Sequence, residues 1–153
     1  MKNDQVLDLF RLNGKTALVT GGARNLGRDM AEALAEAGAN VAITSRDLEQ
    51  AEQTAQTITA TTGRIVAAYE LDVTQESGIC SVIAAAISDF GQLDILVNNA
   101  GNARNAAQFE HRSLSDWEYT FKANSTATFL CTREAAKHMM ARKEGVIINI
   151  ASI

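Results

Sequence analysis

Five short runs of β-branched and other apolar residues recur along the chain, each bounded by glycine or polar residues. Runs that are apolar almost throughout, with little alternation, are typical of strands that are buried on both faces of a sheet. We therefore predict strands at Thr16–Thr20, Asn40–Thr44, Arg64–Leu71, Leu93–Val97 and Gly145–Ala151.

Between the first four runs, apolar residues recur at the spacing of amphipathic helices. The first helix is predicted to end at Gly38 and to bury Leu26, Met30, Ala33, Leu34 and Ala37. The second begins at a cap formed by Asp47 and Gln50, and its apolar stripe is Leu48, Ala51, Ala55 and Ile58. The third ends at Gly91, and its stripe is Ile79, Val82, Ile83, Ala86, Ile87 and Phe90.

A fourth, longer helix is predicted before the last strand. Ser115 and Glu118 form a capping box at its start, and it continues through Phe121 and Phe129 to about Met140. Strands and helices therefore alternate along the whole chain. This order favours an α/β fold with a doubly wound parallel sheet and right-handed crossovers.

The composition narrows the possible partners. A net charge of −4 and the lack of any basic run argue against a nucleic-acid partner. No apolar run approaches the roughly 20 residues of a membrane span, and the first residues lack the apolar core of a signal peptide. We therefore expect a cytoplasmic protein without a membrane partner. The cysteines and histidines show no metal-ligand spacing, so no metal site is expected.

The first predicted strand runs into a glycine-rich turn, Thr20-Gly21-Gly22-Ala23-Arg24-Asn25-Leu26-Gly27, which leads into a helix. Glycines let the backbone approach a pyrophosphate, and the N–H groups and dipole of the helix start hold its charge. An ordinary tight turn is the alternative interpretation. A phosphate-binding NTPase is excluded, because Gly14-Lys15-Thr16 precedes the strand and Leu9 stands where that loop needs a glycine.

Five motifs, taken in chain order, resemble those of the short-chain dehydrogenase/reductase family. Thr20, Gly21 and Gly27 match its glycine motif T-G-x-x-x-[GA]-x-G, with Asn25 at the middle position, where asparagine tolerates a positive φ. The other four motifs are Leu71-Asp72-Val73, Asn98-Asn99-Ala100-Gly101, Asn124 and Ser152. The resemblance implies a Rossmann-like fold in which Asp72 accepts a hydrogen bond from the adenine amine. The implied cofactor-binding residues are Thr20, Gly21, Arg24, Asn25, Leu26, Gly27, Ser45, Arg46, Asp72, Val73, Asn99, Ala100 and Gly101.

The end of the second predicted strand indicates which nicotinamide cofactor is preferred. NAD enzymes place a carboxylate there to hold the ribose hydroxyls, whereas this chain has Ser45 followed by Arg46. Arg24, in the glycine turn, is a second cation, and arginine can bind a 2′-phosphate through two hydrogen bonds. We therefore predict NADP(H) over NAD(H). The alternative is that both arginines are solvated surface residues.

The resemblance also implies a catalytic role for Ser152, which would polarise a substrate carbonyl, and for Asn124, which would help to hold a water molecule. Alternatively, Ser152 caps a strand end and Asn124 satisfies backbone groups in its helix. The family's Y-x-x-x-K motif, which supplies the proton, does not occur in this sequence. Tyr119 and Lys122 are three residues apart rather than four and precede Ser152, so we interpret Tyr119 as an ordinary helix-face residue.

We conclude that the chain consists of a lead-in, residues 1–13, and an NADP(H)-binding Rossmann-like domain, residues 14–153, that is incomplete at its C-terminus. The fifth strand would then be an unpaired apolar edge. The favoured hypothesis is an inactive N-terminal fragment of an oxidoreductase that interconverts small-molecule alcohols and ketones. By family resemblance its parent would be a homodimer or homotetramer that associates through the long helix. The alternative is a non-catalytic dinucleotide-binding or subunit-interaction module.

Overall fold

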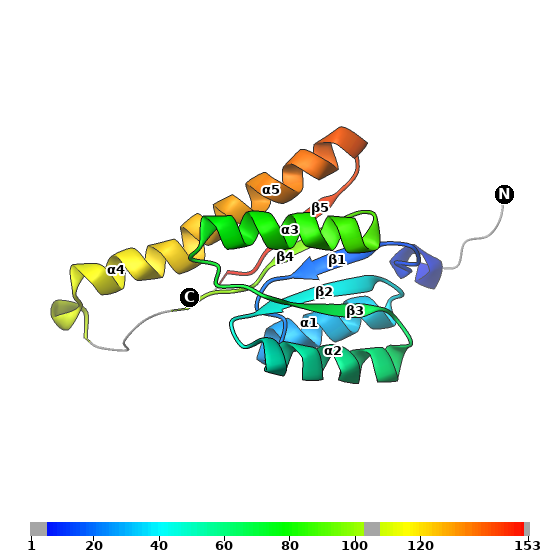
Figure 1. Cartoon of the computed structure of the whole chain (residues 1–153), viewed down its shortest axis with the longest axis horizontal. Coiled ribbons are helices and arrows are strands. Elements are labelled where there is room, and N and C mark those ends of the chain that lie inside the picture. The colour runs from blue at the N-terminus through cyan, green and yellow to red at the C-terminus, as the bar shows by residue number, and fades with distance from the viewer. Residues whose placement is uncertain (1–5, 103–107, 152–153) are drawn as a thin grey trace.

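The computed structural model describes residues 6–102 and 108–151, and its centre is a parallel sheet of five strands (Figure 1). The strands are β1 (Thr16–Val19), β2 (Asn40–Ser45), β3 (Val66–Glu70), β4 (Ile95–Asn98) and β5 (Val146–Asn149). They lie in the order β3-β2-β1-β4-β5, and each neighbouring pair is parallel. The predicted doubly wound α/β fold is confirmed.

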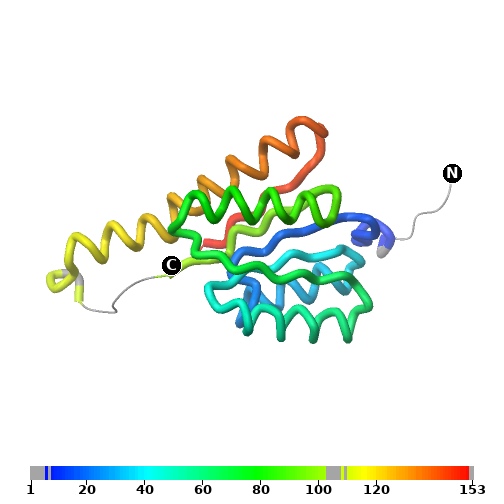
Figure 2. The backbone as a smooth tube through the Cα atoms, in the orientation of Figure 1, coloured from blue at the N-terminus to red at the C-terminus, as the bar shows by residue number. Residues whose placement is uncertain are grey.

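Helices cover both faces of the sheet (Figures 1 and 2). One face carries α1 (Asn25–Glu36) and α2 (Leu48–Thr62), and the other carries α3 (Glu76–Phe90) and α5 (Ala127–Arg142). The core is accordingly divided into two apolar layers, one on each side of the sheet. The remaining helix, α4 (Leu114–Phe121), extends beyond the sheet, and the short 3-10 turns are η1 (Val6–Phe10) and η2 (Phe109–His111).

The predicted buried face of the first helix is wrong. Leu26 is 56% exposed, and the residues of α1 that are buried are Gly27, Ala31 and Ala35. These three residues are small and recur every four positions, so they let the helix backbone lie close to the sheet. Met30 and Leu34 pack only at the side of this contact. The stripes predicted for α2 and α3 are confirmed, except that Leu48 is exposed.

The sequence predicted strands that are buried on both faces, but the two outer strands of the sheet are not. All of β3 is at least partly exposed, and on β5 Val146 is 55% and Ile148 41% exposed. The reason is position, because in the described part of the chain each outer strand has a neighbour on one side only. The expectation that the fifth strand is an apolar edge is confirmed for these residues.

The long helix begins earlier than predicted and is interrupted. Ser113, not Ser115, is its N-cap, because the Ser113 side chain accepts the Asp116 N–H at 3.1 Å. Between α4 and α5 the chain makes one turn of π-helix, η3 (Lys122–Thr126).

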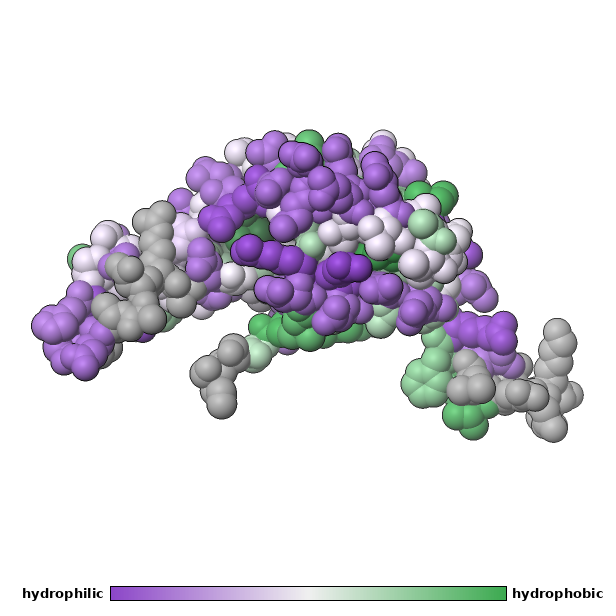
Figure 3. Space-filling view, turned by 90° about the horizontal axis from the view of Figure 1, so that it is seen from below, coloured by the Kyte–Doolittle hydropathy of each residue, from purple (hydrophilic) through white to green (hydrophobic). Residues whose placement is uncertain are grey.

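The face that α1 and α2 present to solvent is mostly hydrophilic (Figure 3). None of the helices described is long and apolar enough for a membrane span.

A buried carboxylate joins the amino ends of the strands. Asp94, which is 3% exposed, accepts the Thr16 N–H at 2.8 Å and the Gln92 side-chain amide at 2.8 Å. Its other oxygen accepts an Arg142 N–H at 3.0 Å, and Arg142 also donates to the Leu93 carbonyl at 3.3 Å. This network holds the start of β1, the start of β4 and the end of α5 together.

Asp94→Ala should lower the free energy of unfolding by about 3 kcal/mol, because it leaves the buried Thr16 N–H without its acceptor and removes the carboxylate that pairs with Arg142. Urea denaturation followed by circular dichroism measures this change. Asp8→Ala is the control, because Asp8 pairs with Arg11 at an exposed site and its loss should cost less than about 0.5 kcal/mol. Equal losses in the two variants would contradict the assignment.

Candidate functional site

A cleft of about 420 Å³ opens at the carboxyl ends of the strands. In the order β3-β2-β1-β4-β5, the chain leaves β1 and β4 toward opposite faces of the sheet, and such a switch point is where open α/β sheets bind ligands. Most of the cofactor-binding residues predicted from the sequence line this cleft. They are Gly21, Arg24, Asn25, Leu26, Gly27, Ser45, Arg46, Asp72, Val73, Asn99, Ala100 and Gly101.

The glycine turn forms the floor of the cleft. Gly21 has φ 66° and Asn25 has φ 48°, so both residues are in the left-handed region, as expected for Asn25. Gly21 donates its N–H to the Thr44 hydroxyl at 3.2 Å. A Cβ on Gly27 would lie 2.1 Å from the Gly21 carbonyl oxygen, so only glycine fits at Gly27. Gly21 and Gly27 both line the cleft, and neither has a side chain that could cover the backbone there.

The start of α1 faces the cleft without a capping side chain. Its N-cap residue, Arg24, makes no side-chain cap hydrogen bond, and Arg24, Asn25 and Leu26 all line the cleft. The N–H groups of a first helical turn have no partner within the helix and carry part of the positive end of its dipole. This combination of a bare turn and an uncapped helix start suits a phosphate or pyrophosphate.

Thr20 lies behind the cleft rather than on its wall and is 2% exposed. Its hydroxyl accepts the N–H groups of Asn99 and Ala100, both at 3.0 Å, and donates to the Val97 carbonyl at 3.3 Å. The Asn99 side chain donates in return to the carbonyls of Thr20 and Gly21, at 3.0 and 3.2 Å. These bonds fix the turn after β1 against the loop after β4.

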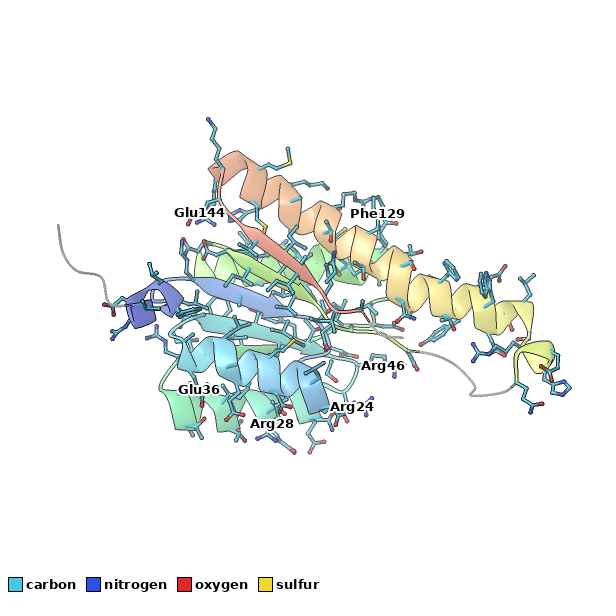
Figure 4. The ribbon with its side chains drawn as sticks, turned by 180° about the vertical axis from the view of Figure 1, so that it is seen from behind. Arg24, Arg28, Glu36, Arg46, Phe129 and Glu144 are labelled. Atoms are coloured by element: carbon cyan, nitrogen blue, oxygen red, sulfur yellow. The ribbon has the colours of Figure 1, made fainter. Side chains whose placement is uncertain are left out.

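Two exposed arginines stand beside the cleft at the end of the sheet where the strands finish (Figure 4). Arg24 comes from the glycine turn, and Arg46 follows β2. The neighbouring carboxylate, Asp47, caps α2 by accepting the Gln50 N–H at 3.0 Å, and its own N–H donates to the Ser45 hydroxyl at 3.1 Å. Asp47 and Gln50 line the cleft but were not predicted, because the sequence pattern had assigned them only to the helix cap.

The Asp72 carboxylate lies on the far wall. Burial raises its pKa, but the N–H and hydroxyl of Thr74 and the charges of Arg46 and Lys122 outweigh this, so the pKa is below its ordinary value. Both bonds from Thr74, at 2.9 and 2.8 Å, reach the same oxygen, Oδ1. The Asp72 side chain is therefore an anion whose Oδ2 can accept an amine hydrogen.

Asn124 lies in the middle of η3, outside the cleft lining. Its amide nitrogen donates to the carbonyls of Asn102 at 2.8 Å and Thr120 at 2.7 Å, which ties the helix to the loop after β4. Tyr119 lies in α4, as predicted for a helix-face residue, and it lines the cleft together with Ala123, which the sequence analysis had not indicated. Their four-residue spacing on one helix face was the available signal.

Ser152 lies outside the described residues. The backbone leading toward it is held as far as Ile150, whose N–H donates to the Asn98 carbonyl at 3.0 Å. Among the residues that the structure describes, no group of three or more acidic, cysteine or histidine side chains is placed to hold a metal ion.

Comparison with known proteins agrees with this geometry. The family model for short chain dehydrogenases matches residues 15–153. Gluconate 5-dehydrogenase of Gluconobacter oxydans is 38% identical over 146 residues, which cover 95% of this chain and 56% of that protein. The chain thus spans about half the length of the curated relatives that it matches.

Solved structures show the same likeness. The NADPH-dependent 3-quinuclidinone reductase of Rhodotorula rubra superposes with a TM-score of 0.92 at 32% identity, over 99% of this chain and 57% of that one. An NAD+-bound xylitol dehydrogenase superposes with a TM-score of 0.87 at 31% identity, over 92% of this chain and 54% of that one. Relatives with either cofactor therefore share the fold, and the chain belongs to the short-chain dehydrogenase/reductase family.

Proposed function

We propose that this chain is the NADP(H)-binding, N-terminal part of an oxidoreductase that interconverts an alcohol and a ketone. The observation that supports this most strongly is the cleft, in which a bare glycine turn and an uncapped helix start lie beside two arginines. When bound there, the nicotinamide would supply or accept the hydride. The chain's own residues would hold the dinucleotide, with the Gly21–Gly27 turn at the pyrophosphate and Asp72 at the adenine amine.

The preference for NADP(H) rests on charge at the end of β2. Arg24 and Arg46 are cations beside the cleft, while the carboxylate that follows Arg46 in sequence, Asp47, already accepts the Gln50 N–H in the first turn of α2. A 2′-phosphate would gain charge-assisted hydrogen bonds from the arginines, whereas a ribose without it would find no carboxylate acceptor at Ser45.

The catalytic part of the proposal assigns Ser152 to polarising the substrate carbonyl oxygen. Asn124 would hold the helix against the Asn102 carbonyl and help to order a water molecule. The proton would come from a Tyr-Lys pair that this sequence does not contain. The second candidate function is a non-catalytic dinucleotide-binding module, which the cleft and its glycine turn would serve equally well.

We also propose that the parent protein is a homodimer or homotetramer. Exposed aromatic side chains follow one another along α4 and α5, and Trp117 is 52%, Phe121 48% and Phe129 60% exposed. Arg133 lies over the Phe129 ring at 5.7 Å. A surface of this kind suits the interface that the family resemblance implies for the long helix.

Arg46→Asp should shift the preference toward NAD(H), because a carboxylate repels the 2′-phosphate and can accept the ribose hydroxyls. The affinity ratio of NADPH to NADH, measured by calorimetry, should fall by about tenfold or more, equivalent to about 1.4 kcal/mol. Arg28→Asp is the matched control, since Arg28 lies on the exposed side of α1, is not part of the cleft lining, and undergoes the same charge change. Equal ratios in the two variants would refute the role of Arg46.

Asn25→Val should weaken NADPH binding, because a β-branched residue resists the positive φ that the turn requires. A strain of about 1–2 kcal/mol corresponds to a loss of about tenfold in affinity. Asn25→Gly should retain the wild-type affinity, since glycine adopts this conformation freely. Identical affinities for the valine and glycine variants would show that the turn does not need this conformation.

The purified 153-residue chain should bind NADPH without oxidising or reducing an alcohol or ketone substrate. Absorbance at the nicotinamide band over hours, with a panel of sugar alcohols and keto acids, measures turnover. Turnover that Ser152→Ala abolishes would show that the chain completes the reaction without a Y-x-x-x-K motif.

A further inference from the structure

The helical arm formed by α4 and α5 contains a change of register. Within η3 the N–H of Ala127 donates to the carbonyl of Lys122, five residues back, where an α-helix would use the fourth residue. One extra residue in a helical turn rotates the side chains that precede the turn by about 100° about the helix axis, relative to the side chains that follow it. Such single π-turns occur frequently at functional sites.

Two side chains donate hydrogen bonds to backbone carbonyls in and next to the turn. The Asn124 amide nitrogen donates to the Thr120 carbonyl at 2.7 Å, and the Thr128 hydroxyl donates to the Asn124 carbonyl at 2.6 Å. Side-chain donors thus reach backbone carbonyls where the regular ladder of hydrogen bonds changes its spacing. The same Asn124 nitrogen reaches the Asn102 carbonyl at 2.8 Å, so the turn is also fixed to the rim of the cleft.

The two helices on either side meet different requirements. The register of α5 is set by the core layer that it shares with α3 and the sheet, in which it buries Leu130, Cys131, Ala135 and Met139. In contrast, α4 has no buried residue, and Tyr119 and Ala123 lie against the cleft. In an uninterrupted α-helix the contacts of α5 would fix the orientation of α4 as well.

We propose that η3 is a register shift that turns Tyr119 and Ala123 toward the cleft while α5 keeps its apolar face on the sheet, with Thr128 as the positioning residue that stabilises it. The effect on ligand binding rests on the proposed function, since it assumes that the cleft holds NADP(H). The geometry of the shift itself does not depend on that function.

Deletion of Ser125 tests the proposal, because Ser125 is exposed and its loss lets the arm become a continuous α-helix. The NADPH affinity should fall by about tenfold as the cleft loses one wall. Trp117, the chain's single tryptophan, lies in α4 and is 52% exposed, so a rotation of α4 changes the solvent exposure of its ring and thereby its emission and its quenching by acrylamide. Ser125→Ala keeps the length of the turn and should match the wild type in both measurements.

A second set of variants keeps the chain length constant. Thr128→Val should lower NADPH affinity and change Trp117 emission in the same direction as the deletion, and Thr128→Ser should restore both. Thr120→Val is the matched control, because it removes an equivalent bond from a threonine hydroxyl to a carbonyl, at 2.7 Å, about two turns earlier in α4. If the deletion variant fails to fold, as judged by cooperative unfolding, the threonine variants decide the question.

The outcomes separate the two proposals. The register shift is overturned if the folded deletion variant matches the wild type in Trp117 emission and quenching, whether or not the chain binds NADPH. If the deletion variant does not fold, the same result for Thr128→Val overturns it. Changed emission with unchanged NADPH affinity overturns the link between the turn and the cleft. A wild-type chain that binds neither NADPH nor NADH refutes the proposed function, and Trp117 still reports the register.

Discussion

The cleft depends on the hydrogen bonds that tie the end of β1 to the end of β4. Because the chain turns toward opposite faces of the sheet after these two strands, their loops would separate without a direct link. Thr20 provides this link, because its buried hydroxyl accepts two N–H groups and donates to one carbonyl of the β4 end. The Asn99 side chain donates two further hydrogen bonds to carbonyls of the β1 end. The glycine turn can therefore stay open toward solvent and still be rigid. Gly27 completes the arrangement by leaving no room for a side chain beneath the turn.

The two ends of the sheet use polar groups for different purposes. At the amino ends, the buried Asp94 is bonded to groups of the protein itself and joins strands to a helix. At the carboxyl ends, Arg24 and Arg46 are exposed and the first turn of α1 has no capping side chain. Two exposed arginines thus stand beside this cleft in a protein with a net charge of −4, and the carboxylates of Asp47 and Asp72 line the same cleft.

The sequence was most informative where the signal is local. Apolar runs located the strands, and the residue types around Thr20–Gly27 predicted both the turn and the positive φ of Asn25. Prediction from the sequence failed where burial or local geometry depends on neighbours that are distant in sequence. Leu26 was assigned to the core because a leucine at helical spacing resembles a core residue, yet the close contact with the sheet is made by Gly27, Ala31 and Ala35. The π-turn at Asn124 was not predicted either, and one of the bonds made by Asn124 goes to the carbonyl of Asn102, 22 residues earlier in the chain.

The pairing of β1 with β4 also has a kinetic consequence. The bonds between Thr20 and the Val97–Ala100 segment join residues 77 to 80 positions apart, whereas β1 and β2 are adjacent both in sequence and in the sheet. Closing the longer loop costs more chain entropy, so the β1–β2–β3 half can assemble while β4 is still unpaired. The cleft then comes into existence only with the last of these pairings, and a bound dinucleotide would stabilise the completed state over every partly folded one.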